Sequence, residues 1–208
     1  MQRVLWLLFL LSFALPAQNS YIDSLTQVAA TAPADTNLIR TYHRLIQRLY
    51  GSRLQEADSL TAVALDLAQN LDAGYLLGRS HYLRALTQEY LGEINSALYH
   101  VRQARASFVK HRRRQEVLMS YELQSNIHLF GNQPDSALQY AIKGQTLAHE
   151  IGDKIGEGVA AVTIANLYSM REMQDQAKSY FQQAEEILRP LNNKNLLGTA
   201  LVGLANCS

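Results

Sequence analysis

The sequence is poor in the residues and patterns on which several classes of protein depend. It contains one cysteine, Cys207, which excludes an internal disulfide framework and a metal site built from cysteines. Its 19 basic and 18 acidic residues give a net charge of +1. This balance argues against binding to nucleic acid or to a membrane surface, since such proteins carry a basic excess. No stretch alternates between apolar and polar residues with a period of two, so we predict no β-sheet.

The spacings typical of catalytic and metal sites are also missing. The histidines do not occur in HxxxH, HExxH or HxH patterns, and they are His43, His81, His100, His111, His128 and His149. There is no GxSxG motif and no glycine-rich phosphate loop. We therefore predict that the protein is not an enzyme and holds neither a metal ion nor a cofactor. His128 is interpreted as a residue that packs against its neighbours.

The longest apolar run lies at the N-terminus. Residues 4–15 (VLWLLFLLSFAL) are uncharged; they follow Arg3 and precede Pro16, Ala17 and a polar stretch. Twelve helical residues span about 18 Å, which is less than the hydrocarbon core of about 30 Å. We therefore predict a secretory signal peptide over residues 1–17, cleaved after Ala17, and no membrane span within this chain. An uncleaved anchor is the alternative.

Beyond this segment, small residues recur with a period of 40. Three columns share one register: Ala57, Ala97, Ala137 and Ala177; Ala64, Ala104, Gly144 and Ala184; and Leu45, Ala85, Ser125, Ala165 and Ala205. Two antiparallel helices approach to about 8–10 Å only where the side chains between them are small. A period of this length indicates an array of helical hairpins.

One unit, residues 120–158, shows which residues begin and end the helices of a hairpin. Gly131 and Asn132 break the helical pattern, Pro134 suits the first turn of the next helix, and Gly152 lies where that helix ends. Read in the same way, the chain predicts helices over about 21–31, 36–50, 54–71, 75–91, 94–110, a helix ending near 130, and then 134–150, 155–170, 173–188 and 196–208. Asp35 or Thr36 is expected to cap the helix that follows.

These residues resemble the tetratricopeptide repeat (TPR), whose small residues fall at the positions of the three columns. Tyr168, Phe181, Gly92 and Pro190 (displaced by one) match further positions of the family. The resemblance implies an all-α fold, a right-handed α-solenoid of antiparallel helix pairs. The six residues beyond the usual 34 are expected to lengthen the helices and the link between units.

The implied organisation is a signal peptide (1–17), a lead-in helix and linker (18–34) and a TPR array (35–208). The repeats lie near 38–77, 78–117, 118–157 and 158–197, with a partial fifth helix at 198–208.

The whole layout resembles the exported TPR sensory region of bacterial membrane-anchored histidine kinases or helix-turn-helix regulators. The resemblance rests on the signal peptide and the stretches QNSYIDSLTQ, TAPADTN and IGDK. It implies an exported scaffold, on the periplasmic or cell-surface side of a bacterial membrane, that binds a peptide or protein partner in signal transduction. A free-standing envelope scaffold without signalling output is the alternative. Ligand identity and oligomeric state stay open.

The C-terminal segment LLGTALVGLANCS is read either as the capping helix of a complete protein or as the start of a truncated repeat. The end of a repeat array needs a polar outer face. Because this segment has few polar residues, we favour truncation.

The TPR resemblance also places candidate ligand-binding residues in a concave groove. Asn126, Asn166 and Asn206 form one column, and family members use asparagine there to bond the backbone of a bound peptide, since an amide offers both a donor and an acceptor. The alternative is that each asparagine bonds its own or an adjacent helix. Further candidates are Tyr42, Tyr82, Glu122, Arg79, Glu89 and Tyr90. The column of Tyr42, Tyr82, Glu122 and Val162 contains no Lys or Arg, so the carboxylate clamp of cytosolic co-chaperone TPRs is absent.

A basic cluster, Lys110-His111-Arg112-Arg113-Arg114, lies between two predicted helices, with Arg102 and Arg105 nearby. Cations near a helix C-terminus interact favourably with the helix dipole. A patch for an acidic partner is the alternative interpretation.

Overall fold

The computed structural model describes residues 20–207, which form helices joined by short loops, with no strand among them. A helical segment over residues 20–31 precedes α2 (Thr36–Leu49), α3 (Leu54–Asn70), α4 (Tyr75–Tyr90), α5 (Ile94–Lys110), α6 (Arg114–Phe130), α7 (Pro134–Ile151), α8 (Lys154–Ser169), α9 (Gln174–Leu188), a 3-10 turn η1 (Arg189–Leu191) and α10 (Lys194–Asn206). Each predicted helix is present, with its ends within two residues of the expected positions. The predicted signal peptide lies outside the described residues.

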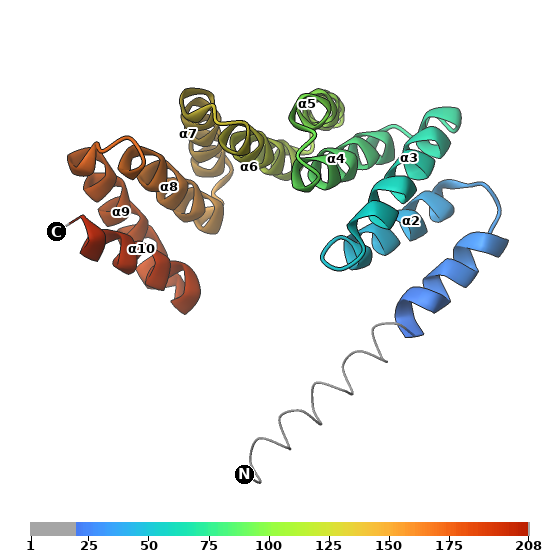
Figure 1. Ribbon diagram of the computed structural model, residues 1–208, viewed down its shortest axis with the longest axis horizontal. Helices are drawn as coiled ribbons and strands as arrows, with labels where there is room; N and C mark the ends of the chain where they lie inside the picture. The colour runs from blue at the N-terminus through green and yellow to red at the C-terminus, as the bar shows by residue number, and fades with distance from the viewer. Residues whose placement is uncertain (1–19, 208) are drawn as a thin grey trace, which may run out of the picture.

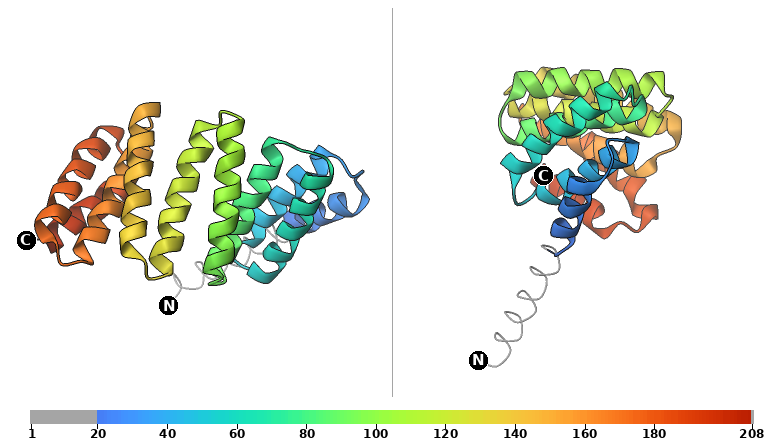
Figure 2. Two further views of the ribbon diagram at one scale, coloured as in Figure 1. Left: turned by 90° about the horizontal axis from the view of Figure 1, so that it is seen from above. Right: turned by 90° about the vertical axis from the view of Figure 1, so that its right-hand side faces the viewer.

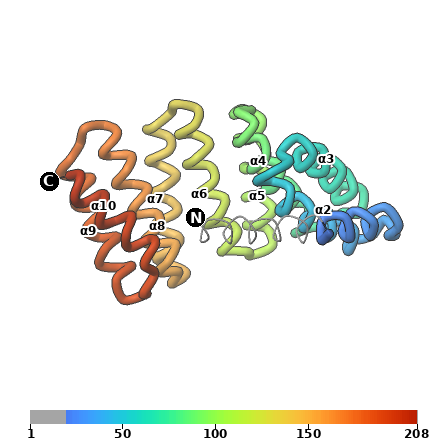
Figure 3. Tube along the Cα trace, turned by 60° about the horizontal axis from the view of Figure 1, so that its bottom comes forward, coloured from blue at the N-terminus to red at the C-terminus, as the bar shows by residue number. Residues whose placement is uncertain are grey.

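Successive helices pair and stack side by side into an arc (Figures 1 and 2). We refer to α2, α4, α6, α8 and α10 as the A-helices and to α3, α5, α7 and α9 as the B-helices. Every helix packs against the one before and the one after it, and A-helices also contact the next A-helix at α2–α4, α4–α6 and α8–α10. In Figure 1, α5 and α7 lie on the outer side of the arc, while α4, α6, α8 and α10 face its inner side. The tube in Figure 3 shows the same succession of hairpins. The fold is an all-α TPR-like solenoid, as predicted.

The three columns of small residues lie inside the helix hairpins. Ala57, Ala97, Ala137 and Ala177 are all fully buried, and so are the alanines of the second column. In the third column, Ala85 and Ala165 are fully buried, whereas Ala205 is exposed. Ala205 lies in the last turn of α10, and no B-helix of the described residues packs over it. The register read from the sequence is therefore the register of the packing.

The backbone conformation of the loops also repeats with a period of 40 residues. Residues with positive φ recur every 40 positions between hairpins (Asp72, Arg112, Gly152, Asn192) and within them (Gly92, Asn132, Glu172). At Gly152 this left-handed residue ends α7, because glycine has no Cβ to clash there. The links between hairpins α3–α4, α5–α6 and α7–α8 contain only two to four residues, while α3 to α9 contain 15–18. Most of each 40-residue repeat therefore lies in its helices, and the longest link between hairpins, residues 189–193 between α9 and α10, contains the 3-10 turn η1.

Two helix starts carry side-chain caps from acidic residues. Asp35 Oδ1 accepts from the backbone N–H of Asn37 and Leu38, at 2.7 and 3.0 Å, as predicted for the start of α2. Asp153 caps α8 by accepting from the N–H of Gly156 at 2.9 Å.

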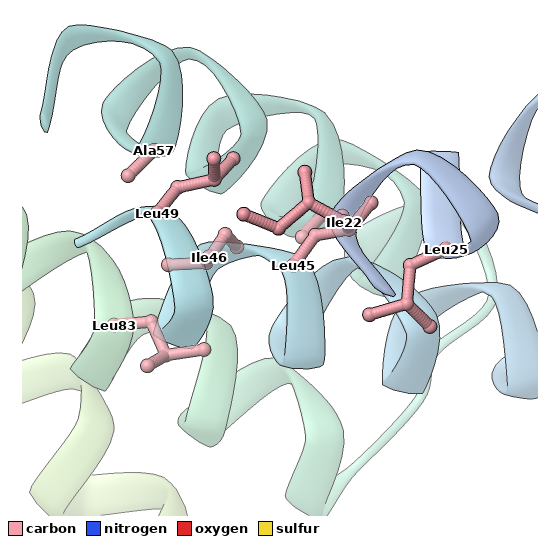
Figure 4. Close-up of a cluster of buried hydrophobic side chains, with 8 residues drawn as sticks. Ile22, Leu25, Leu45, Ile46, Leu49, Ala57 and Leu83 are labelled. Carbon is pink, nitrogen blue, oxygen red and sulfur yellow. The ribbon is translucent and has the colours of Figure 1, made fainter. Parts of the chain in front are cut away.

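The segment over residues 20–31 covers the N-terminal edge of the array. Ile22 and Leu25 are buried in one cluster with Leu45 and Leu49 of α2 (Figure 4). The guanidinium of Arg48 lies 5.3 Å from the ring centre of Tyr21. The predicted lead-in helix is therefore a packed part of the fold.

Candidate functional site

The inner face of the arc carries a hollow between α4 and α6. Its volume is about 490 Å³, within the range of small-ligand pockets. Its walls come from α4, from α6 and from Tyr50, the residue directly after α2. The lining residues are Tyr50, Tyr82, Leu86, Glu89, Tyr90, Met119, Glu122, Leu123, Asn126, Leu129 and Phe130. We call it the α4–α6 hollow.

Five of the residues predicted for the groove line this hollow: Tyr82, Glu89, Tyr90, Glu122 and Asn126. The other two asparagines lie further along the A-helices. Asn166 and Asn206 line a second hollow of about 480 Å³ between α8 and α10. A smaller space of about 150 Å³, between α6 and α8, is bordered by Asn126 and Glu122. The predicted column therefore follows a chain of hollows along one face.

The side chains of Asn126, Asn166 and Asn206 are exposed. Within residues 20–207, none of these side chains makes a hydrogen bond to the protein. Their amides therefore remain available to a ligand, and the interpretation in which they bond an adjacent helix has no contact to support it.

Two predicted groove residues lie outside the α4–α6 hollow. Tyr42 packs, partly buried, against the first core cluster, beside Leu45 and Ile46. The positive charge of Arg79 lies near Tyr82 and His43: it opposes the rise that burial causes in the pKa of Tyr82, and it adds to the lowering that burial causes in the pKa of His43.

Two acidic residues lie in the walls of the hollow. Glu89 is only 5% exposed, and burial raises the pKa of its carboxyl to about 7. Burial also raises the pKa of Glu122 to about 7, and the negative charge of Asp153 adds to this shift. Each carboxyl is thus held near the midpoint of its titration at neutral pH, in a wall where the charged form is costly.

Aromatic rings surround these carboxyls. Tyr50 and Tyr90 meet edge to face, with ring centres 4.7 Å apart. Burial raises the pKa of Tyr82 to about 12, with a further rise from Glu122, so this phenol stays neutral at physiological pH. Tyr90 and Phe130 are 62% and 69% exposed. The rim of the hollow is thus an open aromatic surface.

Sequence reasoning missed part of this rim. Tyr50, Tyr90, Phe130 and Met170 are spaced by 40 residues, each directly after or at the end of an A-helix. Of this column only Tyr90 was chosen from the sequence. The repeat spacing was the signal that could have found the others, because exposed apolar residues at a fixed repeat position form a strip on one face.

The basic cluster between α5 and α6 is largely used in contacts within the protein. Arg113 pairs with Glu116 at 2.7 Å and lies 4.5 Å from the ring centre of Tyr75. Arg114 pairs with Glu150 at 2.5 Å. The contacts of Arg113 with Tyr75 and of Arg114 with Glu150 join neighbouring repeats, so these two cations already have partners within the protein.

His128 packs as the sequence indicated, since its ring stacks on Tyr140 with centres 5.3 Å apart and planes 9° from parallel. Over the described part of the chain, no three His, Cys, Asp or Glu side chains gather in a way that could hold a metal ion. Nor does any helix between residues 20 and 207 have the length and apolar character needed to span a bilayer.

No family model and no curated protein matches the sequence. Several solved structures share the fold. RapI in its apo form has a TM-score of 0.77 at 12% identity, over 91% of this chain and 53% of its own. A Podosopora anserina kinesin light chain with nearly identical TPR-like repeats has a TM-score of 0.69 at 15% identity, over 85% and 89% of the two chains. A Rap protein complexed with competence and sporulation factor has a TM-score of 0.62 at 16% identity, over 91% and 57%.

This chain spans about half the length of the Rap proteins that it matches. At these identities the likeness concerns the fold, and it places the chain among TPR-like repeat structures.

Proposed function

We propose that this protein is a scaffold that binds an extended segment of a peptide or protein partner along its A-helices. The observation that carries the proposal is the row of exposed, unbonded asparagines, Asn126, Asn166 and Asn206, along a face with three successive hollows. Packed helices lie about 8–10 Å apart and an extended chain rises about 3.4 Å per residue, so amides spaced by one repeat can bond peptide units that lie about three residues apart. The match to a Rap protein that is complexed with competence and sporulation factor supports a ligand-binding use of such an array.

The proposal extends to cellular context. The N-terminal apolar run and the layout of the chain support an exported scaffold on the periplasmic or cell-surface side of a bacterial membrane, acting as the sensory part of a signal-transduction protein. A free-standing envelope scaffold, without signalling output, is the second candidate. An open reading frame that continues into an apolar run of about 20 residues would favour the sensor.

The binding proposal is tested with a phage-displayed random peptide library as the probe. Peptides selected on the wild-type protein are synthesised, and their affinities are measured calorimetrically. Asn126→Ala and Asn166→Ala should each weaken binding roughly 2- to 12-fold, since one hydrogen bond nets about 0.5–1.5 kcal/mol. Asn95→Ala, an exposed asparagine on the B-helix α5, is the matched control and should leave affinity unchanged. Selected peptides that bind all three variants like the wild type would contradict the groove.

A further inference from the structure

Glu89 and Glu122 are acidic residues whose carboxyls are withdrawn from solvent and have no cationic partner. Glu116 and Glu157, for comparison, pair with Arg113 and Lys154 at 2.7 Å. Throughout the described chain, neither carboxyl of the hollow takes part in a hydrogen bond or an ion pair. Glu89 is only 5% exposed as a residue, and its unpaired carboxyl borders an open hollow. A buried carboxylate without a counter-charge destabilises the fold.

Among residues 20–207, no cation supplies this counter-charge. The two arginines of α4 act elsewhere: Arg79 influences Tyr82 and His43, and Arg84 influences His81 and His100. Neither is among the causes that shift the pKa of Glu89 or Glu122. Asp153, which faces Glu122 from the start of α8, adds negative charge. The hollow is therefore a concave site of negative charge with room for a side chain.

The aromatic walls suit the same occupant. Tyr50, Tyr82 and Tyr90 line the hollow beside the carboxyls, and Phe130 continues the wall on α6. The face of an aromatic ring attracts a cation within about 6 Å of its centre, most strongly where water is excluded. Carboxylates and aromatic faces together select a cationic side chain over a neutral or acidic one.

We propose that the α4–α6 hollow receives a lysine or arginine side chain of the bound segment, with an apolar neighbour of that residue against Tyr90 and Phe130. This ligand class rests on the peptide-binding function proposed above. The cation of the ligand sits between Glu89 and Glu122 and balances the negative charge of their carboxylates. The asparagine column binds the backbone of the same segment.

The first experiment selects a phage-displayed random library in parallel on the wild-type protein and on the double variant Glu89→Gln, Glu122→Gln. The wild type should enrich peptides with Lys or Arg next to an apolar residue, and the double variant should not. Glu186→Gln, an exposed glutamate on the B-helix α9, is the matched control and should enrich like the wild type. A stability measurement accompanies each variant, so that unfolding is not mistaken for lost binding.

The second experiment replaces the enriched arginine of the best peptide by citrulline, its neutral analogue. On the wild type the loss should be about 10- to 100-fold, the range for a hydrogen bond to a charged group. On the double variant the same replacement should change affinity less than about twofold. The four affinities form a double-mutant cycle that measures the interaction between the arginine of the peptide and the two carboxyls. Affinity of the arginine peptide should also rise between pH 6 and pH 8, because both carboxyls ionise around pH 7.

The outcomes separate the two proposals. If peptides bind and Asn126→Ala weakens them, but wild type and double variant select the same residues, the basic ligand is wrong and the peptide groove stands. If acidic or purely apolar peptides are enriched on the wild type, the charge argument is overturned. If neither protein enriches any peptide, both proposals fail.

Discussion

The two halves of the array are built on one backbone repeat but have chemically different interiors. Between α2 and α5, buried histidines bond one another and neighbouring hydroxyls. His81 and His100 approach with Nδ1 atoms 2.8 Å apart, and His43 Nε2 lies 2.8 Å from Ser80 Oγ. Between α8 and α10, the interior is almost wholly apolar: Ala161, Val162, Ala165, Ala177, Phe181, Ala184, Leu188 and Ala200.

Residues at the same position of different repeats show this difference between polar and apolar interiors directly. One repeat beyond His81 and His100 are Tyr121 and Tyr140, whose rings stack with centres 6.3 Å apart. Gln88 is buried and its Oε1 has no partner, while the equivalent Tyr168 stacks on Tyr180. The small-residue columns thus fix where helices meet, and the remaining inter-helix positions accept polar or apolar pairs. The comparison locates buried histidines with lowered pKa values in the N-terminal half and an apolar core cluster in the C-terminal half.

The largest effect should come from the apolar half. Phe181 is 2% exposed, and its ring fills the space left by Gly203, where a Cβ would lie 2.3 Å from it. Phe181→Ala should cost about 3–5 kcal/mol of unfolding free energy. Denaturant unfolding measures it, and the loss should be equal at pH 5 and pH 7.5, since no histidine or carboxyl belongs to this cluster. Phe130→Ala, at an exposed ring, is the control and should change stability by less than about 0.5 kcal/mol.

A smaller effect tests the feature that both halves share. Ala85→Leu and Ala165→Leu, at fully buried positions of one column, should each destabilise by about 1–3 kcal/mol, because a larger side chain forces the hairpin apart. Ala137→Leu, in the first column, should behave alike. Ala205→Leu occupies the same column but is exposed, so its midpoint should stay at the wild-type value. A similar midpoint for Ala165→Leu and Ala205→Leu would show that burial does not set the cost.

The smallest effect concerns acid. Burial lowers the pKa of His43 and His100 to about 4, so the unfolded chain takes up protons first as pH falls. Their contribution to stability is therefore present above pH 6.5 and is lost between pH 6.5 and pH 4, by about 1–2 kcal/mol for His43 after allowance for solvent screening. His100→Tyr, which installs the residue found at Tyr140 and Tyr180, should reduce this loss in denaturant midpoints measured at pH 7 and pH 4.5. An identical loss in variant and wild type would remove the histidine pair as its cause.

Glu89 and Glu122 affect the pH dependence of stability with the opposite sign to the histidines. Their raised pKa values make the folded state the better proton binder, so their cost appears as pH rises from 4.5 to 7. The acid experiment is therefore cleanest in the Glu89→Gln, Glu122→Gln background. That double variant should also be more stable than the wild type at pH 8, as expected where a binding site is maintained at a cost to the fold.

The sequence alone determined the helices, their ends and the register of their packing. Period and residue size suffice for this, because contacts in a hairpin repeat are local and are copied from one unit to the next. Ala137, Gly152 and Asp35 could each be placed without coordinates. The asparagine column was also readable, since a spacing of one repeat puts its members on one face.

Only the tertiary structure decided which candidates meet. Tyr50 of one repeat joins Glu89 of the next and Phe130 of a third around one hollow, while Tyr42 and Arg79 lie outside it. The tertiary structure also decided that Glu89 has no counter-charge, whereas Arg113 is paired with Glu116. The physical reason is that burial and pairing depend on the distances between side chains of different repeats, which the curvature of the stack sets and a one-dimensional period does not contain.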